Sequence, residues 1–547
     1  MKRRMGLASP SFPRKRESLS TVRQWIPPFA AMTKLKCISL ILLALAFLLP
    51  SRSAEGQTPM KDSLEGLEPR PLWEHFFAIS RIPRCSRNEA KVRAYVLEVA
   101  TRNGCAHQTD RTGNTVVRKE ATAGMEARPI VILQAHLDMV CEKNKDTEHD
   151  FSKDPIRLKR DGDWVRADGT TLGADNGIGV AAQLALIDEK TIAHGPLEFL
   201  FTVDEETGLT GATGLAPDML EGRVLVNLDA EEESTLYIGC AGGQDTVLVL
   251  PLETEAVPGG FAAASIRVGG LQGGHSGLEI DRGRGNAIKL LARFLAKKAP
   301  LLEVRVAHID GGSKRNAIPR ECDAVVCLPP ANLQALKEGA REFEQICKKE
   351  YRVQDSGVCV RVAVEGFPEP DQVFRADLQA RILNLLVCLP HGVIRMSPDI
   401  PGLVQTSTNL AVVRVEGRAF VISTSQRSSV ATELVAASDS VAAAGRLAGA
   451  HVHHDEGYPG WKPNPDSRVL GLAKTVYPSL FGKEPKVTAI HAGLECGIIG
   501  DRFEGMDMIS LGPTITGAHS PDEGVEISSV KPFWDFLVAI LGSIDAE

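Results

Sequence analysis

The 547-residue sequence has few aromatic residues and no excess of positive charge. Only 5% of its residues are Phe, Trp or Tyr, and the formal net charge is -7. Without a basic footprint, the chain is not expected to bind nucleic acid. Hydrophobic residues still make up 43% of the chain. This content excludes a fibrous or disordered protein and is enough for a large core divided into two or more domains.

The eleven cysteines do not form the closely spaced framework of a small disulfide-rich domain. Cys322 and Cys327 are the only close pair, and their spacing is unlike that of a zinc knuckle. We therefore expect a reduced, buried set of thiols.

The apolar run near the N-terminus is too short to favour a membrane span. The segment "MTKLKCISLILLALAFLLPSRSAEGQ" starts at Met32 with lysines, continues with about fourteen apolar residues and ends in small polar residues. This layout predicts a secretory signal, cleaved near Ser53 or Ala54, with no stable membrane span after cleavage. We expect residues 1–57 to be a leader and signal peptide and the protein to be exported, to the periplasm; a cytoplasmic location is the alternative.

Three apolar strand-like runs end in acidic residues: "ARPIVILQAHLD", "GPLEFLFTVDEE" and "GRVLVNLDAEE". Between the first two, "LGADNGIGVAAQLALIDEK" predicts a glycine-rich turn leading into a helix. Strands that alternate with helices predict an α/β fold with a mostly parallel sheet flanked by helices. In such sheets the functional site lies beyond the carboxyl ends of the strands.

Six acidic or imidazole side chains fall at strand ends or in the turns just beyond, so the fold would gather them at one edge of the sheet. They are His136, Asp138, Asp175, Glu205, Glu206 and Asp229. Carboxylates crowded together raise one another's pKa, whereas divalent cations would neutralise them. A mixed set of imidazole and carboxylate ligands suits Zn²⁺, with Co²⁺ or Mn²⁺ as substitutes, and two ions about 3.5 to 4 Å apart are typical of hydrolases. A stabilising calcium ion is the alternative, although calcium sites seldom use histidine.

Two pairs within this set suggest a division of roles. His136 and Asp138 lie two residues apart and would share one face of a strand, as a metal ligand and its orienting carboxylate do. Glu205 and Glu206 are adjacent and would point to opposite faces, so one is expected to be a ligand and the other a general base. Two solvated glutamates are the alternative.

Several ordered motifs resemble the aminoacyl-histidine dipeptidases, also called Xaa-His or beta-alanyl-histidine dipeptidases. The motifs are "HLDMV", "LGADNGIGVA", "FTVDEETGLTGA", "VNLDAEEE", "GGHSG", "GGSKRNAIP", "YPGWKPNPDS" and "GAHSPDE". These enzymes belong to the di-zinc metallopeptidases that include peptidase T, carboxypeptidase G and acetylornithine deacetylase. The resemblance extends from about residue 65 to the C-terminus.

The resemblance implies a role for each site residue. It implies His136 and Asp229 on the first ion, Asp175 as the bridge, Glu206 and His519 on the second ion, Asp138 as orienter of His136 and Glu205 as general base. It also implies a cis peptide bond between Asp175 and Asn176. An aspartate at position 229, where carboxypeptidase-like members tend to have glutamate, resembles the dipeptidase side of the superfamily.

The long separation between Asp229 and His519 implies an inserted domain. By resemblance, residues 243–457 form an α+β lid that also mediates homodimerisation, and residues 58–242 and 458–547 form the catalytic domain. Within the lid, His275 resembles a histidine that stabilises the oxyanion, often in the partner subunit's site. Asn316 and Arg427 resemble groups that bind the substrate carboxylate, for which a guanidinium is well suited.

The predicted function is metal-dependent hydrolysis of small dipeptides, of the Xaa-His type by resemblance. The alternatives within the superfamily are a tripeptide aminopeptidase and an N-acyl amino acid deacylase. A binding module that has lost catalysis is a third hypothesis. The presence of all five ligands and of Glu205 in the sequence argues against it.

Overall fold

The computed structural model describes residues 65–545. The predicted leader and signal at residues 1–57 lie outside this range. Within the described residues, no helix is both long enough and apolar enough to cross a membrane.

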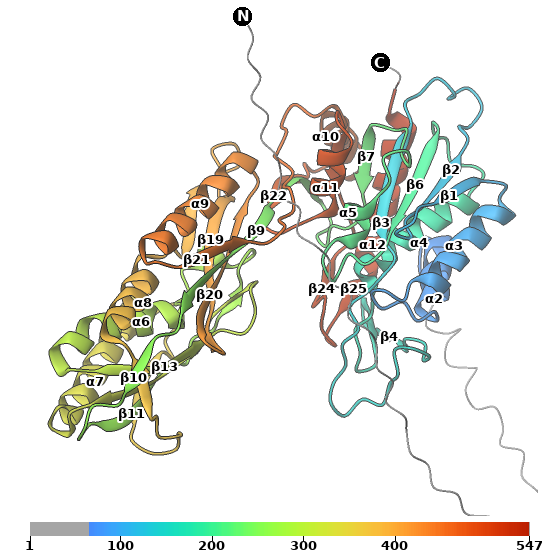
Figure 1. The fold of residues 1–547 in the computed structure, drawn as a ribbon. Coiled ribbons are helices and arrows are strands. Elements are labelled where there is room, and N and C mark those ends of the chain that lie inside the picture. Colours follow the sequence, from blue (N-terminus) through green and yellow to red (C-terminus); the bar gives the residue numbers. More distant parts are fainter. Residues whose placement is uncertain (1–64, 546–547) are drawn as a thin grey trace, which may run out of the picture. The chain divides into compact units, whose positions relative to one another are not determined.

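The first sheet has eight strands, which come from two separate parts of the chain. They are β1 (Ala106–Thr109), β2 (Thr115–Lys119), β3 (Val131–His136), β6 (Leu197–Thr202), β7 (Val224–Asn227), β8 (Thr235–Cys240), β22 (Lys486–Ile490) and β23 (Asp507–Ser510). Their order is β1-β2-β6-β3-β7-β23-β8-β22 (Figure 1). Four neighbouring pairs are parallel and three are antiparallel. The run β6-β3-β7-β23 is parallel throughout, so its carboxyl ends lie at one edge.

Helices cover both faces of this sheet. They are α2 (Arg70–Ser80), α3 (Ala90–Arg102), α4 (Ala174–Asp188), α5 (Thr210–Gly214), α10 (Arg468–Phe481), α11 (Glu495–Arg502) and α12 (Ile527–Ser543). Successive side chains of a strand point to opposite faces. Accordingly, Val131, Leu133 and Ala135 of β3 join a core with α2, α3, α4, α10 and α12. Ile132 joins a second core with α5 and α11. Both faces of β3 are therefore buried, which explains why its sequence is a continuous apolar run.

The segment between β8 and β22 contains a second, nine-stranded sheet. Its strands are β9 (Gly242–Pro251), β11 (Ala262–Gly269), β13 (Arg305–Gly311), β15 (Cys322–Leu328), β16 (Cys359–Ala363), β18 (Gly392–Met396), β19 (Val404–Glu416), β20 (Ala419–Ser428) and β21 (His451–His454). They pair in the order β16-β11-β15-β13-β19-β20-β9-β21, with β18 also on β19. All these pairings are antiparallel.

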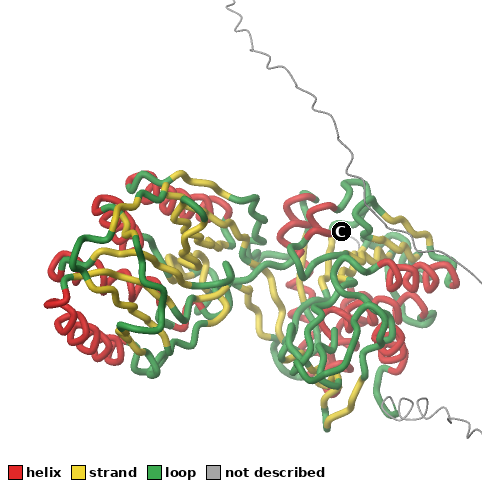
Figure 2. Tube along the Cα trace, turned by 60° about the horizontal axis from the view of Figure 1, so that its bottom comes forward, coloured by secondary structure: helices red, strands yellow, loops and turns green. Residues whose placement is uncertain are grey.

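Helices of the same segment pack against the second sheet and share its apolar core (Figure 2). They are α6 (Ala287–Leu302), α7 (Leu333–Glu350), α8 (Ala376–Cys388) and α9 (Ala431–Leu447), and the short 3-10 helices are η1 (Ile280–Arg282) and η2 (Pro330–Asn332). The predicted fold class is confirmed: an α/β sheet flanked by helices, with an inserted α+β segment. The domain boundaries at 242/243 and 457/458 stay predictions.

Three small sheets complete the described chain. The first joins β4 (Leu158–Asp161), β5 (Trp164–Ala167), β24 (Ile515–Thr516) and β25 (Gly524–Glu526); the others pair β10 (Thr254–Ala256) with β17 (Gln372–Phe374) and β12 (Gly274–His275) with β14 (Ala317–Ile318). Because β25 pairs with β5, the C-terminal segment that carries His519 is fixed against the N-terminal part of the catalytic fold.

The expectation of a reduced, buried set of cysteines is wrong in two respects. Cys85 and Cys141 form a disulfide across 56 residues of sequence. Of the remaining described cysteines, Cys388 is exposed. The disulfide could not be predicted from the sequence, because its two cysteines lie in different loops that only the fold brings together.

Candidate active site

His136 is the last residue of β3 and is almost completely buried. Its Nδ1 lies 3.4 Å from Oδ1 of Asp138. The Asp138 carboxylate also accepts hydrogen bonds from the backbone N–H groups of Glu205 and Glu206, at 3.1 and 3.2 Å. Burial by itself raises the pKa of Asp138, but contact with His136 and hydrogen bonds from its other neighbours lower it to about 2. Asp138 is thus an ionised carboxylate that fixes both the imidazole and the Glu205–Glu206 turn.

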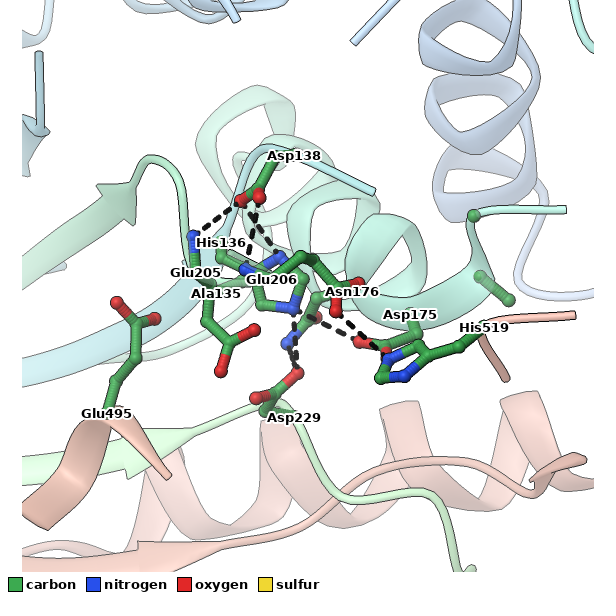
Figure 3. Close-up of polar contacts among 12 residues, drawn as sticks. Ala135, His136, Asp138, Asp175, Asn176, Glu205, Glu206, Asp229, Glu495 and His519 are labelled. Carbon is green, nitrogen blue, oxygen red and sulfur yellow. Dashed lines mark hydrogen bonds and ion pairs between the residues drawn. The ribbon is translucent and has the colours of Figure 1, made fainter. Parts of the chain in front are cut away.

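The other predicted ligands converge in front of His136, forming two groups that share Asp175 (Figure 3). In the first, Nε2 of His136 lies 3.1 Å from Oδ1 of Asp175 and 3.3 Å from Oδ1 of Asp229. In the second, Nε2 of His519 lies 3.1 Å from Oδ2 of Asp175 and 3.0 Å from Oε2 of Glu206. The ligand atoms of each group lie within 4.8 Å of one another. Asp175 therefore turns one oxygen to each group, as a carboxylate bridging two ions does.

The donor chemistry fits divalent ions. Each group combines one imidazole with two carboxylates, and Oε1 of Glu206 is buried without a hydrogen-bond partner among the described residues. Burial, with the neighbouring charges of Asp175 and Glu206, raises the pKa of Asp229 to about 6. Hydrogen bonds with Asp175 and Glu206 raise the pKa of His519 to about 11. These shifts express a concentration of negative charge that bound cations would offset.

The loop before α4 presents the shared aspartate. The peptide bond between Asp175 and Asn176 is cis, as the resemblance implied, and the side-chain amide of Asn176 donates to Asp229. The carboxylate of Glu523 accepts the backbone N–H groups of Leu172, Gly173, Ala174 and Asp175, at 2.7, 2.9, 2.7 and 3.3 Å. The buried side chain of Glu523 thus fixes the backbone of residues 172–175.

Glu205 and Glu206 follow a bend in the chain, because Asp204 has a positive φ of 51°. This bend brings both glutamates within ligand distance of His136, although neighbours on a regular strand would point apart. Burial raises the pKa of Glu205 well above its usual value; the charge of His136 lowers it, and those of Asp229, Glu206 and Glu495 raise it further.

Glu495 is fully buried at the start of α11 and lies near Glu205 (Figure 3). Its Oε2 accepts hydrogen bonds from Nε2 of Gln134 and Oγ1 of Thr202, both at 2.6 Å. Burial raises its pKa to about 7. Neither Glu495 nor Glu523 was predicted from the sequence. The only available signal for Glu523 was its place in "GAHSPDE", four residues after His519.

The three predicted lid residues lie outside the ligand groups formed by the described residues. Nδ1 of His275 accepts hydrogen bonds from the backbone N–H groups of Gly277 and Leu278, at 3.3 and 3.1 Å. Burial and the charge of Arg427 lower the pKa of His275 to about 4. A neutral imidazole that accepts at Nδ1 carries its proton on Nε2. His275 is therefore a hydrogen-bond donor through Nε2.

Arg427 and Asn316 differ in their surroundings. Arg427 is buried in β20; its Nη1 donates to the Tyr458 hydroxyl at 3.0 Å, and its Nε has no partner among the described residues. Asn316 is exposed, and its backbone carbonyl accepts from the N–H of Ser276, the residue after His275.

Solved and curated proteins similar to this chain include peptidases. The cytosol non-specific dipeptidase of Escherichia coli (strain K12) is 44% identical over 487 residues, which cover 88% of this chain and 99% of the relative. The crystal structure of aminoacylhistidine dipeptidase from Vibrio alginolyticus matches with a TM-score of 0.80 and 42% identity, over 88% of this chain and 98% of that one. A tripeptidase from Staphylococcus aureus matches at 16% identity with a TM-score of 0.51, over 87% and 99% of the two chains, and shares the fold.

The prediction of export is contradicted by the first of these relatives, whose name places it in the cytosol. The apolar run that suggested a signal lies outside the described residues. The prediction of export relied only on a short apolar run with flanking lysines, which is a pattern of composition.

The match to the family's own sequence model spans most of the described chain. The model of peptidase family M20/M25/M40 matches residues 132–543, a range that contains every residue of the two ligand groups. The chain therefore belongs to peptidase family M20/M25/M40.

Proposed function

We propose that this protein is a two-metal dipeptidase that hydrolyses small dipeptides of the Xaa-His type. One observation carries the proposal: the two ligand groups share Asp175, with Glu205 beside them. The names of the relatives at 44% and 42% identity, a non-specific dipeptidase and an aminoacylhistidine dipeptidase, support the substrate class. The tripeptidase is a distant relative, so tripeptide cleavage is the less favoured function.

His136, Asp175 and Asp229 would hold one divalent ion, and Asp175, Glu206 and His519 the other. The donor set favours Zn²⁺, with Co²⁺ or Mn²⁺ as substitutes. Bound ions would lower the pKa of a water molecule and polarise the scissile carbonyl.

Glu205 is proposed as the general base. It would take the proton of the attacking water and deliver it to the nitrogen of the leaving amino acid. Burial and the surrounding carboxylates raise the pKa of Glu205, which favours its protonated form when cations are absent. Cations next to it would favour the ionised form that a base requires.

The three lid residues are proposed to contact the substrate. Nε2–H of His275 is proposed to donate to the carbonyl oxygen as it becomes an oxyanion. Arg427 and Asn316 are proposed to bind the terminal carboxylate. The Nε of Arg427, which has no hydrogen-bond partner within residues 65–545, supports this role.

We further propose a homodimer formed through the inserted domain. Support comes from β18, an edge of the second sheet, whose apolar side chains Val393, Ile394 and Met396 are 38%, 47% and 44% exposed. Burial of such a row in a symmetric interface would remove apolar surface from water and cover an open strand edge.

A substrate panel tests the function. The purified protein, loaded with zinc, is assayed against beta-alanyl-histidine, a second dipeptide without histidine, a tripeptide and an N-acetyl amino acid. We expect the highest kcat/KM for the two dipeptides and a kcat that Glu205→Gln lowers by about 10² to 10⁴. Preference for the tripeptide or the N-acetyl amino acid would overturn the proposed substrate class.

A further inference from the structure

The segment between α2 and α3 touches both loops that carry the metal ligands. Arg84, which is 2% exposed, donates from Nη1 to the carbonyls of Leu137 and Asp138, at 3.0 and 2.8 Å, and from Nη2 to the carbonyl of Gly173. The first two carbonyls follow His136 at the end of β3, and the third lies two residues before Asp175. One buried guanidinium thus joins the loop after β3 to the loop before α4.

The guanidinium of Arg84 leaves no room for side chains at two neighbouring positions, Gly173 and Gly177. A Cβ at Gly173 would lie 2.6 Å from Nη2 of Arg84, and a Cβ at Gly177 would lie 2.7 Å from the same atom. Gly173 also has a φ of 71°, which side chains disfavour. Glycine is therefore required at both positions, 173 in the loop and 177 in the helix, for Arg84 to occupy this place.

Ser86, two residues after Arg84 in the sequence, contacts the side chain of Asp138. Its hydroxyl donates to Oδ2 of Asp138 at 2.8 Å, on the carboxylate that orients His136 and the Glu205–Glu206 turn.

A disulfide is formed by Cys85, which stands between Arg84 and Ser86 in the sequence. Cys85 is bonded to Cys141, three residues after Asp138. Cys85 also forms a parallel bridge with Met139, whose N–H donates to the carbonyl of Arg84 at 3.2 Å. The covalent bond therefore ties the Arg84–Ser86 segment to the loop after β3 at its centre.

We propose that Arg84 and Ser86 are positioning residues for the metal ligands, and that the Cys85–Cys141 disulfide holds them in place, so that its reduction weakens metal binding. This inference rests on the two-metal centre of the proposed function. With the covalent tie broken, the segment can open locally, which removes the carbonyl contacts of Arg84 and the hydroxyl contact on Asp138. Loss of such outer contacts typically costs about 10- to 100-fold in metal affinity.

The chemical step is a two-electron reduction. The Sγ–Sγ bond breaks, and the two sulfurs take up two electrons and two protons to become thiols. In the test the reductant is a water-soluble phosphine, which is oxidised to the phosphine oxide with oxygen from water. The phosphine is removed by desalting without air before metal is measured, so that it does not compete for the ions.

The experiment compares Zn²⁺ affinity, by competition with a chromophoric chelator, in the untreated and the reduced full-length protein. Reduction should expose two additional thiols in the denatured protein and weaken Zn²⁺ binding about 10- to 100-fold. The double variant Cys85→Ser/Cys141→Ser should bind Zn²⁺ as weakly as the reduced protein, and phosphine should not change its affinity. The control Cys388→Ser, at an exposed lid cysteine, should respond as the wild type does.

Two further variants separate positioning from general destabilisation. Ser86→Ala should weaken Zn²⁺ binding in the oxidised protein, and Ser86→Thr, which keeps a hydroxyl, should restore it. Circular dichroism checks that each variant is folded. The proposal is overturned if the reduced protein and the double-serine variant both bind Zn²⁺ within twofold of the untreated wild type. An untreated wild type that binds no divalent ion would instead overturn the proposed function.

Discussion

Glu523 provides a sharp test of how the site is built. Its carboxylate is 2% exposed and accepts four backbone N–H groups in the loop that leads to Asp175. In Glu523→Gln, one oxygen remains to serve two of these amides, and an amide NH₂ group faces the other two. A hydrogen bond to a charged acceptor contributes about 1.5 to 3 kcal/mol. Loss of two such bonds therefore predicts a local destabilisation of about 3 to 6 kcal/mol.

Hydrogen exchange measures this local destabilisation at the backbone amides that lose their acceptor. At about 1.4 kcal/mol per factor of ten, the lower figure corresponds to amides at residues 172–175 that exchange about 100-fold faster, provided that they exchange through local opening. Zn²⁺ affinity should fall as well, because Asp175 loses its fixed position. Asp522→Asn is the matched control: it removes a carboxylate from the adjacent, exposed position and should change neither quantity. Unchanged exchange at residues 172–175 in Glu523→Gln would refute the idea that this carboxylate holds the loop.

The remaining predictions concern the chemistry. Chelation should abolish hydrolysis and Zn²⁺ should restore it, with close to two ions per chain by metal analysis; full activity in a metal-free preparation would contradict the two-metal site. Glu205→Gln should retain its metal and lower kcat by about 10² to 10⁴, whereas an equal loss of metal would make Glu205 a ligand. His275→Ala should retain both ions and lower kcat by about 10² to 10³. Burial and Arg427 lower the pKa of His275 to about 4, so its imidazole is already neutral above pH 6. If kcat falls at acid pH with a midpoint near 6, His275→Ala should therefore leave that midpoint unchanged. Arg427→Ala should act mainly by raising KM; a fall in kcat alone would assign it another role.

The positions of several candidate ligands were predictable because parallel strands impose a simple geometry. His136 ends β3, and Glu206 and Asp229 follow β6 and β7, so all three lie at the edge where the carboxyl ends of these parallel strands meet. The sequence pattern identified these strands correctly. The bridging role of Asp175 and the placement of His519 relied on the resemblance, because His519 comes from a distant loop.

The supporting residues could not be predicted by the same reasoning. Arg84, Glu523 and Glu495 make their contacts with groups far away in the sequence, and none of them has a periodic or spacing signal. The Cys85–Cys141 bond was missed for the same reason. Only the tertiary structure shows that these groups surround the ligands.

The order of the strands also has a consequence for biosynthesis. β23 lies between β7 and β8, and β22 pairs with the other edge of β8, yet both are translated after the entire inserted segment. Until residues 486–510 leave the ribosome, β7 and β8 lack their shared neighbour and expose unpaired strand edges. Such edges promote aggregation of unfinished chains. His519 and Glu523 follow later still, so the proposed metal site is completed only in the last stage of synthesis.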